Sequence, residues 1–111
     1  MTLQAKTITP SDAHFGIDDV IGDKRDAILA LAQQYGAYNV RIFGSVARGQ
    51  ARPTSDIDFL VDWDYERVSA WGSGELRDEL QTLLGRAIDI VSAKWLDPPL
   101  SEQILREAVV L

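Results

Sequence analysis

The sequence predicts one α/β domain of the α+β kind, in which helices back a mixed β-sheet. Segments with helical spacing alternate along the chain with short runs of β-branched and aromatic residues, as is typical of a sheet covered by helices. The gap between the first two expected strands is too short for a full crossover helix, so we expect the sheet to be mixed. A length of 111 residues fits one domain with a single core.

The first expected helix spans 20–35, where apolar residues recur every three or four positions and Gly36 follows as a C-terminal stop. A strand is expected at 40–43, which is β-branched and aromatic, and a helical turn or short helix at 45–50. The next strand is expected at 56–63, where apolar residues occupy one face.

The second half of the chain continues this alternation. Ser73 is expected to cap a helix that Gly85 ends, and a third strand is expected at 87–91. The Asp-Pro pair at 97–98 is expected to open another helix, since proline suits the first helical position. Residues 108–111 are either a fourth strand or a frayed end.

The N-terminal region differs from the rest. Residues 1–18 mix Thr, Pro, Ser, Asp and Gly without a period, which predicts a flexible arm. Residues 19–111 then form the domain.

Charge and composition exclude several classes of site and partner. The chain has 17 acidic and 11 basic residues, a formal net charge of −6, and this acidity argues against strong nucleic-acid binding. The absence of cysteine excludes disulfides, thiolate nucleophiles and cysteine zinc sites, and a single histidine excludes any site that needs two. We recognise no secretory signal and no apolar run near the ~20 residues of a membrane span, so we expect a cytoplasmic protein with no membrane contact.

Gly44 and Ser45 lie where a strand is expected to stop and a helical turn to begin. Glycine lets a ligand approach the backbone, and the unpaired amides that open the turn can bind an anion. The Ser45 hydroxyl adds a donor, so a polyphosphate cradle is plausible here. It is not a Walker loop, because no Gly-Lys-Ser/Thr follows.

Asp56 and Asp58 are two residues apart in an expected strand and therefore project from one face. Like charges this close are costly unless a cation neutralises them. With no cysteine and one histidine in the chain, oxygen ligands favour a hard ion such as Mg²⁺.

Asp89 interrupts an otherwise apolar strand at 87–91, where an ionised carboxylate is costly unless it is paired or coordinated. If this strand lies beside the strand of Asp56 and Asp58, all three acids can meet at one site. Taken alone, Asp89 has a second interpretation, as an edge-strand acid that faces water.

Other polar residues have a structural reading. A second Asp-x-Asp pair, at 62 and 64, is interpreted as a solvated strand end. Asp62 follows Asp58 by four residues, about 13 Å at ~3.3 Å per residue, too far to share an ion with Asp56. Arg48 can contact a phosphate or an acceptor, or form a surface ion pair, and both readings stay open.

The two motifs together resemble a known family. Phe-Gly-Ser-Val-Ala-Arg-Gly at 43–49, then Ser-Asp-Ile-Asp-Phe-Leu-Val at 55–61 and a single later strand acid at Asp89, resemble the polymerase-β-like nucleotidyltransferase superfamily. They look closest to its small single-domain branch, the minimal nucleotidyltransferases or MntA-like proteins. The resemblance covers about residues 20–111 and retains every motif acid.

The resemblance implies a polymerase-β-like fold and a role for each motif residue. Asp56 and Asp58 would hold two Mg²⁺ ions that bridge the triphosphate of ATP, and Asp89 would ligate one of them and help to deprotonate the acceptor hydroxyl. Gly44 and Ser45 would bind the β- and γ-phosphates. The acceptor would then displace pyrophosphate in line at the α-phosphorus.

Small members of this branch commonly act as antitoxins beside a HEPN-domain toxin, and their proposed chemistry is transfer of AMP to a tyrosine of that partner. The resemblance therefore implies a protein adenylyltransferase and a hetero-oligomeric state, with a homo-oligomer still open. Two alternatives remain: an antitoxin that neutralises its partner by binding alone, and nucleotidyl transfer to RNA or to a small molecule such as an aminoglycoside.

Overall fold

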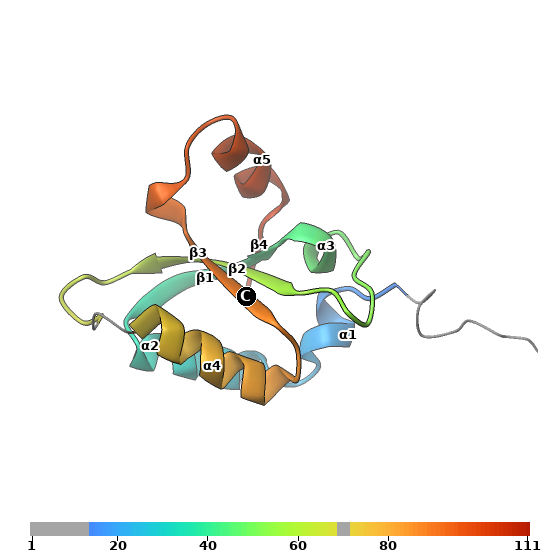
Figure 1. The fold of residues 1–111 in the computed structure, drawn as a ribbon, viewed down its shortest axis with the longest axis horizontal. Helices are drawn as coiled ribbons and strands as arrows, with labels where there is room; N and C mark the ends of the chain where they lie inside the picture. The colour runs from blue at the N-terminus through green and yellow to red at the C-terminus, as the bar shows by residue number, and fades with distance from the viewer. Residues whose placement is uncertain (1–13, 69–71) are drawn as a thin grey trace, which may run out of the picture.

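A mixed sheet organises the chain, of which the computed structural model describes residues 14–68 and 72–111 (Figure 1). In spatial order the strands of the described part are β3 (Ile88–Ser92), β2 (Ile57–Trp63), β1 (Ala37–Phe43) and β4 (Val109–Val110). The helices are α1 (Ile17–Ile21), α2 (Arg25–Gln34), α3 (Gly44–Ala47), α4 (Gly72–Leu84), the 3₁₀ turn η1 (Ala93–Trp95) and α5 (Leu100–Glu107). None of these helices has the length and apolar character needed to cross a membrane.

Strand β1 runs antiparallel to both of its neighbours, β2 and β4. Strands β2 and β3 are parallel, and α4 lies between them in sequence as the crossover that a parallel pair requires. The connection from β1 to β2 holds only the short helix α3 and a loop, which is enough for an antiparallel pair. The predicted mixed sheet with helices is confirmed.

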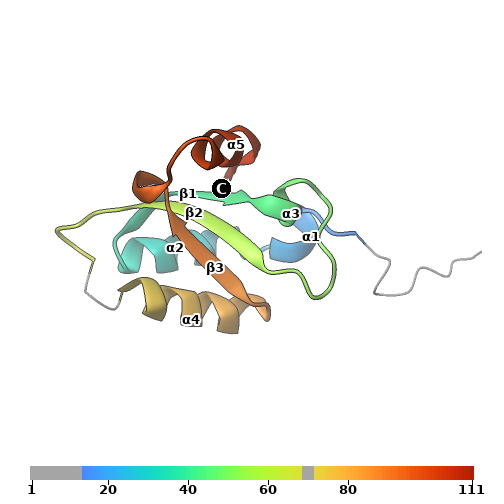
Figure 2. The same ribbon diagram turned by 45° about the horizontal axis from the view of Figure 1, so that its top comes forward.

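The two faces of the sheet carry different residues, as β2 shows. Ile57, Phe59 and Val61 are buried in the main core, on the face that α2 and α4 cover (Figure 2). The alternate residues of β2 face the side on which α5 lies, and there Leu60 of the strand and Ile104 of the helix are buried. Because Asp58 alternates with these core residues, it lies on the α5 face.

The first expected helix is two helices in the structure. The chain breaks at Gly22, whose φ of 58° no right-handed helix accommodates, and it resumes as α2 at Arg25. Ile21 and Ile28, one from each helix, are both buried in the same core. The apolar spacing thus marked a common buried face and not a continuous helix.

Two further helix starts differ from the prediction. Helix α4 begins at Gly72, so Ser73 lies in its first turn instead of capping it. Helix α5 begins at Leu100 and not at the Asp-Pro pair 97–98, because Pro98 precedes a second proline and a residue in that position disfavours the helical conformation. Residues 109–110 do form a fourth strand.

Part of the predicted N-terminal arm belongs to the fold. Phe15 forms a β-bridge with Ala51, and α1 begins at Ile17, so a boundary at residue 18 is too late. Phe15 packs against the main core. Because turn-forming residues surround it in the sequence, the pattern does not indicate that it packs there. Residues 1–13, the rest of the predicted arm, lie outside the described residues.

Candidate active site

Three segments distant in sequence meet at one end of the sheet. Strand β1 ends at Phe43, which pairs with Asp58 of β2, and the Gly-Ser pair at 44–45 follows directly. Asp58 in turn pairs with Asp89 across the parallel β2–β3 ladder, so these two carboxylates project from the same face. Asp56 lies immediately before β2. The fold therefore brings the two motifs and the later acid together.

Gly44 turns the chain from β1 into α3 and leaves room for Asp58. Its φ is 76°, in the left-handed region that glycine alone enters freely. A Cβ at this position would overlap the Asp58 carboxylate. Ser45, partly buried, follows within the first turn of α3. The backbone of this turn can lie against the acids only because the residue is glycine.

The Asp58 carboxyl sits where its charge is disfavoured. Partial burial, followed by the negative charges of Asp89, Asp56 and Glu107, raises its pKa from the ordinary 3.8 to about 6. The Arg48 guanidinium acts in the opposite direction and lowers this pKa. A cation among these carboxylates would relieve the repulsion.

The donor set suits a hard divalent cation. Asp56, Asp58 and Asp89 offer only oxygen ligands, which Mg²⁺ prefers, and the raised pKa of Asp58 indicates acids whose charge is incompletely compensated. Across residues 14–68 and 72–111, no three His, Cys, Asp or Glu side chains converge closely enough to enclose an ion. Asp56 and Asp89 are both exposed to solvent.

Asp89 lies beside Asp58, as expected, but its side chain is exposed to solvent. The sequence leaves Asp89 either inside a buried strand or on an edge strand facing water, and the structure shows the second: β3 is an edge strand of the described sheet and Asp89 is exposed. Ile88 and Ile90 pack in or against the main core, so only one face of this strand is well covered. The argument from desolvation fails for Asp89, and its candidacy depends on its pairing with Asp58.

Glu107, which the sequence analysis missed, lies in the same place. The Gly44 N–H donates to its Oε2 over 2.5 Å, and Arg48 Nη1 donates to its Oε1 over 3.1 Å. The pairing of β4 with β1 explains this position. Ile42 pairs with Val109, and in an antiparallel register two residues onward from Ile42 correspond to two residues back from Val109, so Glu107 lies opposite Gly44. No motif spacing signals the contact; only the β1–β4 pairing could have indicated it.

Arg86 is a second residue that the sequence analysis missed. Its Nη1 donates to the carbonyl oxygens of Arg52, over 2.9 Å, and Ser55, over 3.2 Å. Its guanidinium also lies 5.6 Å from the centre of the Phe15 ring. These contacts hold the loop that leads into Asp56, so Arg86 is a positioning residue for that acid.

Arg48 forms an ion pair, one of the two interactions that the sequence leaves open for it. It forms an ion pair with Glu107, and that pair lies beside Asp58 and not on a remote surface. A groove of 580 Å³ adjoins Arg48 and is lined in part by Asp18 and Val110. A larger hollow of 740 Å³ lies at the other end of β1 and β2, away from the acids.

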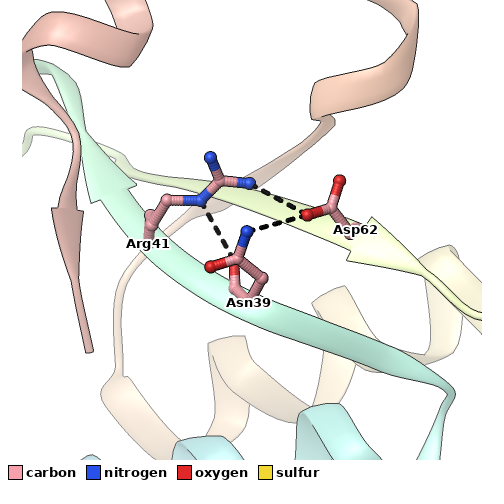
Figure 3. A network of polar contacts seen from close by, with 3 residues as sticks. All are labelled: Asn39, Arg41 and Asp62. Atoms are coloured by element: carbon pink, nitrogen blue, oxygen red, sulfur yellow. Dashed lines mark hydrogen bonds and ion pairs between the residues drawn. The ribbon is translucent and has the colours of Figure 1, made fainter.

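Asp62 is not the solvated strand end that the sequence predicts. Its carboxylate accepts from Asn39 Nδ2 over 2.9 Å and pairs with Arg41 Nη2 over 3.4 Å (Figure 3). Arg41 Nε donates to the Asn39 carbonyl as well, over 3.1 Å. The irregular register between Tyr38 and Arg41 brings both partners to Asp62, which is thus a neutralised structural acid.

Comparison with known proteins agrees with this geometry. Residues 27–111 match the polymerase beta nucleotidyltransferase family. The chain is 37% identical to the protein adenylyltransferase MntA of Thermococcus cleftensis, over 71% of this chain and 79% of that protein. A solved structure of a proposed minimal nucleotidyltransferase is 48% identical, with a TM-score of 0.71 over 79% of this chain and 89% of the other.

A toxin–antitoxin complex with AMP-PNP shares the fold, with a TM-score of 0.65 at 22% identity over 77% of this chain and 69% of that chain. The family match covers both motifs, the acids and the strands that bring them together. The chain belongs to the polymerase beta nucleotidyltransferase family and is a nucleotidyltransferase.

Proposed function

We propose that this protein transfers AMP from ATP, with Mg²⁺, to a tyrosine side chain of a HEPN-type toxin and so acts as its antitoxin. One observation carries the proposal above all: the partly buried Asp58 lies beside Asp89 and against the glycine turn that begins α3. The similarity to a protein adenylyltransferase supports a protein acceptor, and the fold shared with a toxin–antitoxin complex supports a toxin partner. AMP-PNP in that complex, an ATP analogue, favours ATP as the donor.

Each group of residues in the site has its own role in the reaction. The turn at Gly44 and Ser45, with the Arg48 guanidinium beside it, holds the β- and γ-phosphates by hydrogen bonds and charge. Asp89 accepts the proton of the acceptor hydroxyl. The hydroxyl oxygen forms a bond to the α-phosphorus, the bond from that phosphorus to the β-phosphate oxygen breaks, and pyrophosphate leaves. Each group acts mainly by positioning and by placed charge.

Asp56, Asp58 and Asp89 would hold two Mg²⁺ ions. When bound, Mg²⁺ offsets the negative charge of the triphosphate and of the attacking and leaving oxygens. Burial, together with the negative charges of Asp89, Asp56 and Glu107, raises the pKa of Asp58 and disfavours its ionised form without a cation, and this supports the metal requirement.

The charge of the chain favours a protein acceptor over RNA. A formal net charge of −6 repels a phosphate backbone and attracts a basic protein surface. The groove beside Arg48 carries both signs of charge, because Asp18 and Asp19 line it together with Arg25. The preference for a protein acceptor therefore rests on the net charge of the whole chain.

Two forms of labelled ATP test the proposal. The protein is incubated with Mg²⁺ and a candidate HEPN-type toxin, using ATP labelled at the α-phosphate or at the γ-phosphate. We expect the α-label on a partner tyrosine and no transfer of the γ-label. Asp58→Asn should abolish labelling, and Asp62→Asn, the same change on the same strand, should retain it.

Other outcomes identify the alternatives. Label found only on RNA or on an aminoglycoside would show that the proposed acceptor is wrong. If the Asp58→Asn variant still neutralises the toxin fully, the protein neutralises by binding and the proposed mechanism is wrong.

A further inference from the structure

The structure already holds an anion at the phosphate cradle, and that anion is the protein's own Glu107. Its carboxylate accepts the Gly44 N–H over 2.5 Å and lies 3.1 and 3.2 Å from Arg48 Nη1. In the proposed function, these same two donors bind the phosphates of the nucleotide. Carboxylate and phosphate oxygens use the same kind of charge-assisted hydrogen bond, so the two anions compete.

The position is an unfavourable one for an acid. Glu107 is 19% exposed at its side chain and contributes to the rise in the pKa of Asp58, so it adds a negative charge to a site that already holds three aspartates. Such an arrangement persists only because the amide and the guanidinium compensate the Glu107 charge. A bound triphosphate with its cations would take over both donors and leave Glu107 without them.

The local structure allows Glu107 to leave. It is the last residue of α5, and the chain continues through Ala108 in an extended conformation into β4. The carboxylate is at the end of a flexible side chain, so rotation about its side-chain bonds withdraws it while α5 and β4 keep their hydrogen bonds. Release therefore requires no unfolding.

We propose that Glu107 acts as an internal substitute for a nucleotide phosphate and lowers the affinity of the site for ATP until the triphosphate displaces it. This inference rests on the proposed function and deepens it. The nucleotide binds only the form in which Glu107 has left the cradle. Its apparent dissociation constant is the intrinsic constant divided by the fraction of protein in that form. If Glu107 occupies the cradle about nine-tenths of the time, the penalty is about tenfold.

Calorimetric titration with Mg·AMP-PNP tests this, using the wild-type protein, Glu107→Gln, Glu107→Ala and the control Glu102→Gln. Glu102 is an exposed acid in the first turn of the same helix, so its variant removes an equal charge from α5 at a distance from the cradle. We expect both Glu107 variants to bind about tenfold more tightly and the control to stay within about twofold of wild type. Magnesium tripolyphosphate, which has no base or sugar, should show the same order.

The outcomes separate the two proposals. Unchanged affinity in both Glu107 variants overturns the inference and leaves the proposed function intact. Weaker binding in them also overturns it, because Glu107 would then support Arg48 or a cation. Failure of every protein, wild type included, to bind nucleotide or to transfer AMP overturns both.

A measurement on the unmodified chain keeps the inference testable if the variants fold poorly. By NMR, addition of Mg·AMP-PNP should shift the Gly44 amide and the Glu107 side-chain signals together. Nucleotide binding that leaves the Glu107 signal unmoved would overturn the inference.

Discussion

Asp58 and Asp62 project from the same face of the same strand, and their surroundings are opposite. Asp62 lies between Arg41 and Asn39, which supply a positive charge and a hydrogen bond (Figure 3). Asp58 is partly buried among Asp56, Asp89 and Glu107, and its burial and these charges raise its pKa to about 6. Leu60, between them on this face, is fully buried and separates the two environments.

The comparison shows what distinguishes an acid that stabilises the fold from an acid that serves a site. Each belongs to an Asp-x-Asp pair and each lies within β2, so their sequence patterns are alike. The difference lies in the partners that the neighbouring strands supply: β1 neutralises Asp62, whereas the segments around Asp58 add further negative charge. The same substitution at the two positions should therefore have opposite effects.

The largest expected difference is in catalysis. Asp58→Asn should lower the rate of AMP transfer by about 1,000-fold, because it removes a ligand and a charge at the reacting groups. Asp62→Asn should leave the rate within about twofold. Single-turnover transfer from α-labelled ATP measures both, and comparable losses in the two variants would remove the distinction between the acids.

Gly44 tests how closely the turn must approach Asp58. Gly44→Ala should slow transfer by about 100-fold, since the added Cβ displaces the carboxylate and misplaces the phosphate cradle. Gly85, which also has a positive φ of 67° but no atom near an added Cβ, is the matched control. If Gly44→Ala slows transfer no more than Gly85→Ala does, the close approach has no part in the reaction.

Stability should fall at Asp62. Asp62→Asn breaks the ion pair with Arg41, whose side chain is only 12% exposed, and should lower the free energy of unfolding by about 1 kcal/mol. Urea denaturation at neutral pH measures this change. An unchanged midpoint would show that the Arg41–Asp62 pair contributes nothing to the fold.

At Asp58 the same change should stabilise the protein in metal-free buffer, and only above acidic pH. Because the folded-state pKa of about 6 exceeds the ordinary 3.8, the folded state holds its proton more tightly and the wild-type protein loses stability as pH rises between these values. The rise corresponds to about 3 kcal/mol, which solvent screening of a partly exposed group reduces to about 1 kcal/mol.

The Asp58→Asn variant avoids this loss, so its advantage should be about 1 kcal/mol at pH 8 and should disappear near pH 4. Urea denaturation across this range, in buffer treated with a chelator, supplies the measurement. A variant less stable than wild type at pH 8 would mean that Asp58 supports the fold.

The sequence predicts those parts of the molecule that depend on residues close together in the chain. The mixed sheet follows from alternating segments and one short connection, and the motif at 43–58 is joined by the antiparallel β1–β2 pair alone. Gly44 and Asp58 could therefore be placed together without knowledge of the rest of the fold.

Contacts between distant segments account for what the sequence could not predict. Glu107 reaches Gly44 only through β4, and the Arg41 partner of Asp62 lies across the sheet on β1. The burial of Asp89 could not be decided from the sequence, because strand composition does not reveal that β3 is at the edge of the described sheet. The first expected helix is interrupted for a local reason. Gly22 has a positive φ, and the spacing of apolar residues does not indicate this.

The most direct test of the central claim is cation binding to these two acids. Mg²⁺ is titrated by calorimetry into the protein with a saturating non-hydrolysable ATP analogue, using wild type, Asp58→Asn and Asp62→Asn. We predict that wild type and Asp62→Asn bind Mg²⁺ with similar affinity and that Asp58→Asn loses at least about tenfold, the loss expected for removal of one charged ligand. Equal Mg²⁺ affinity in all three proteins would contradict the account.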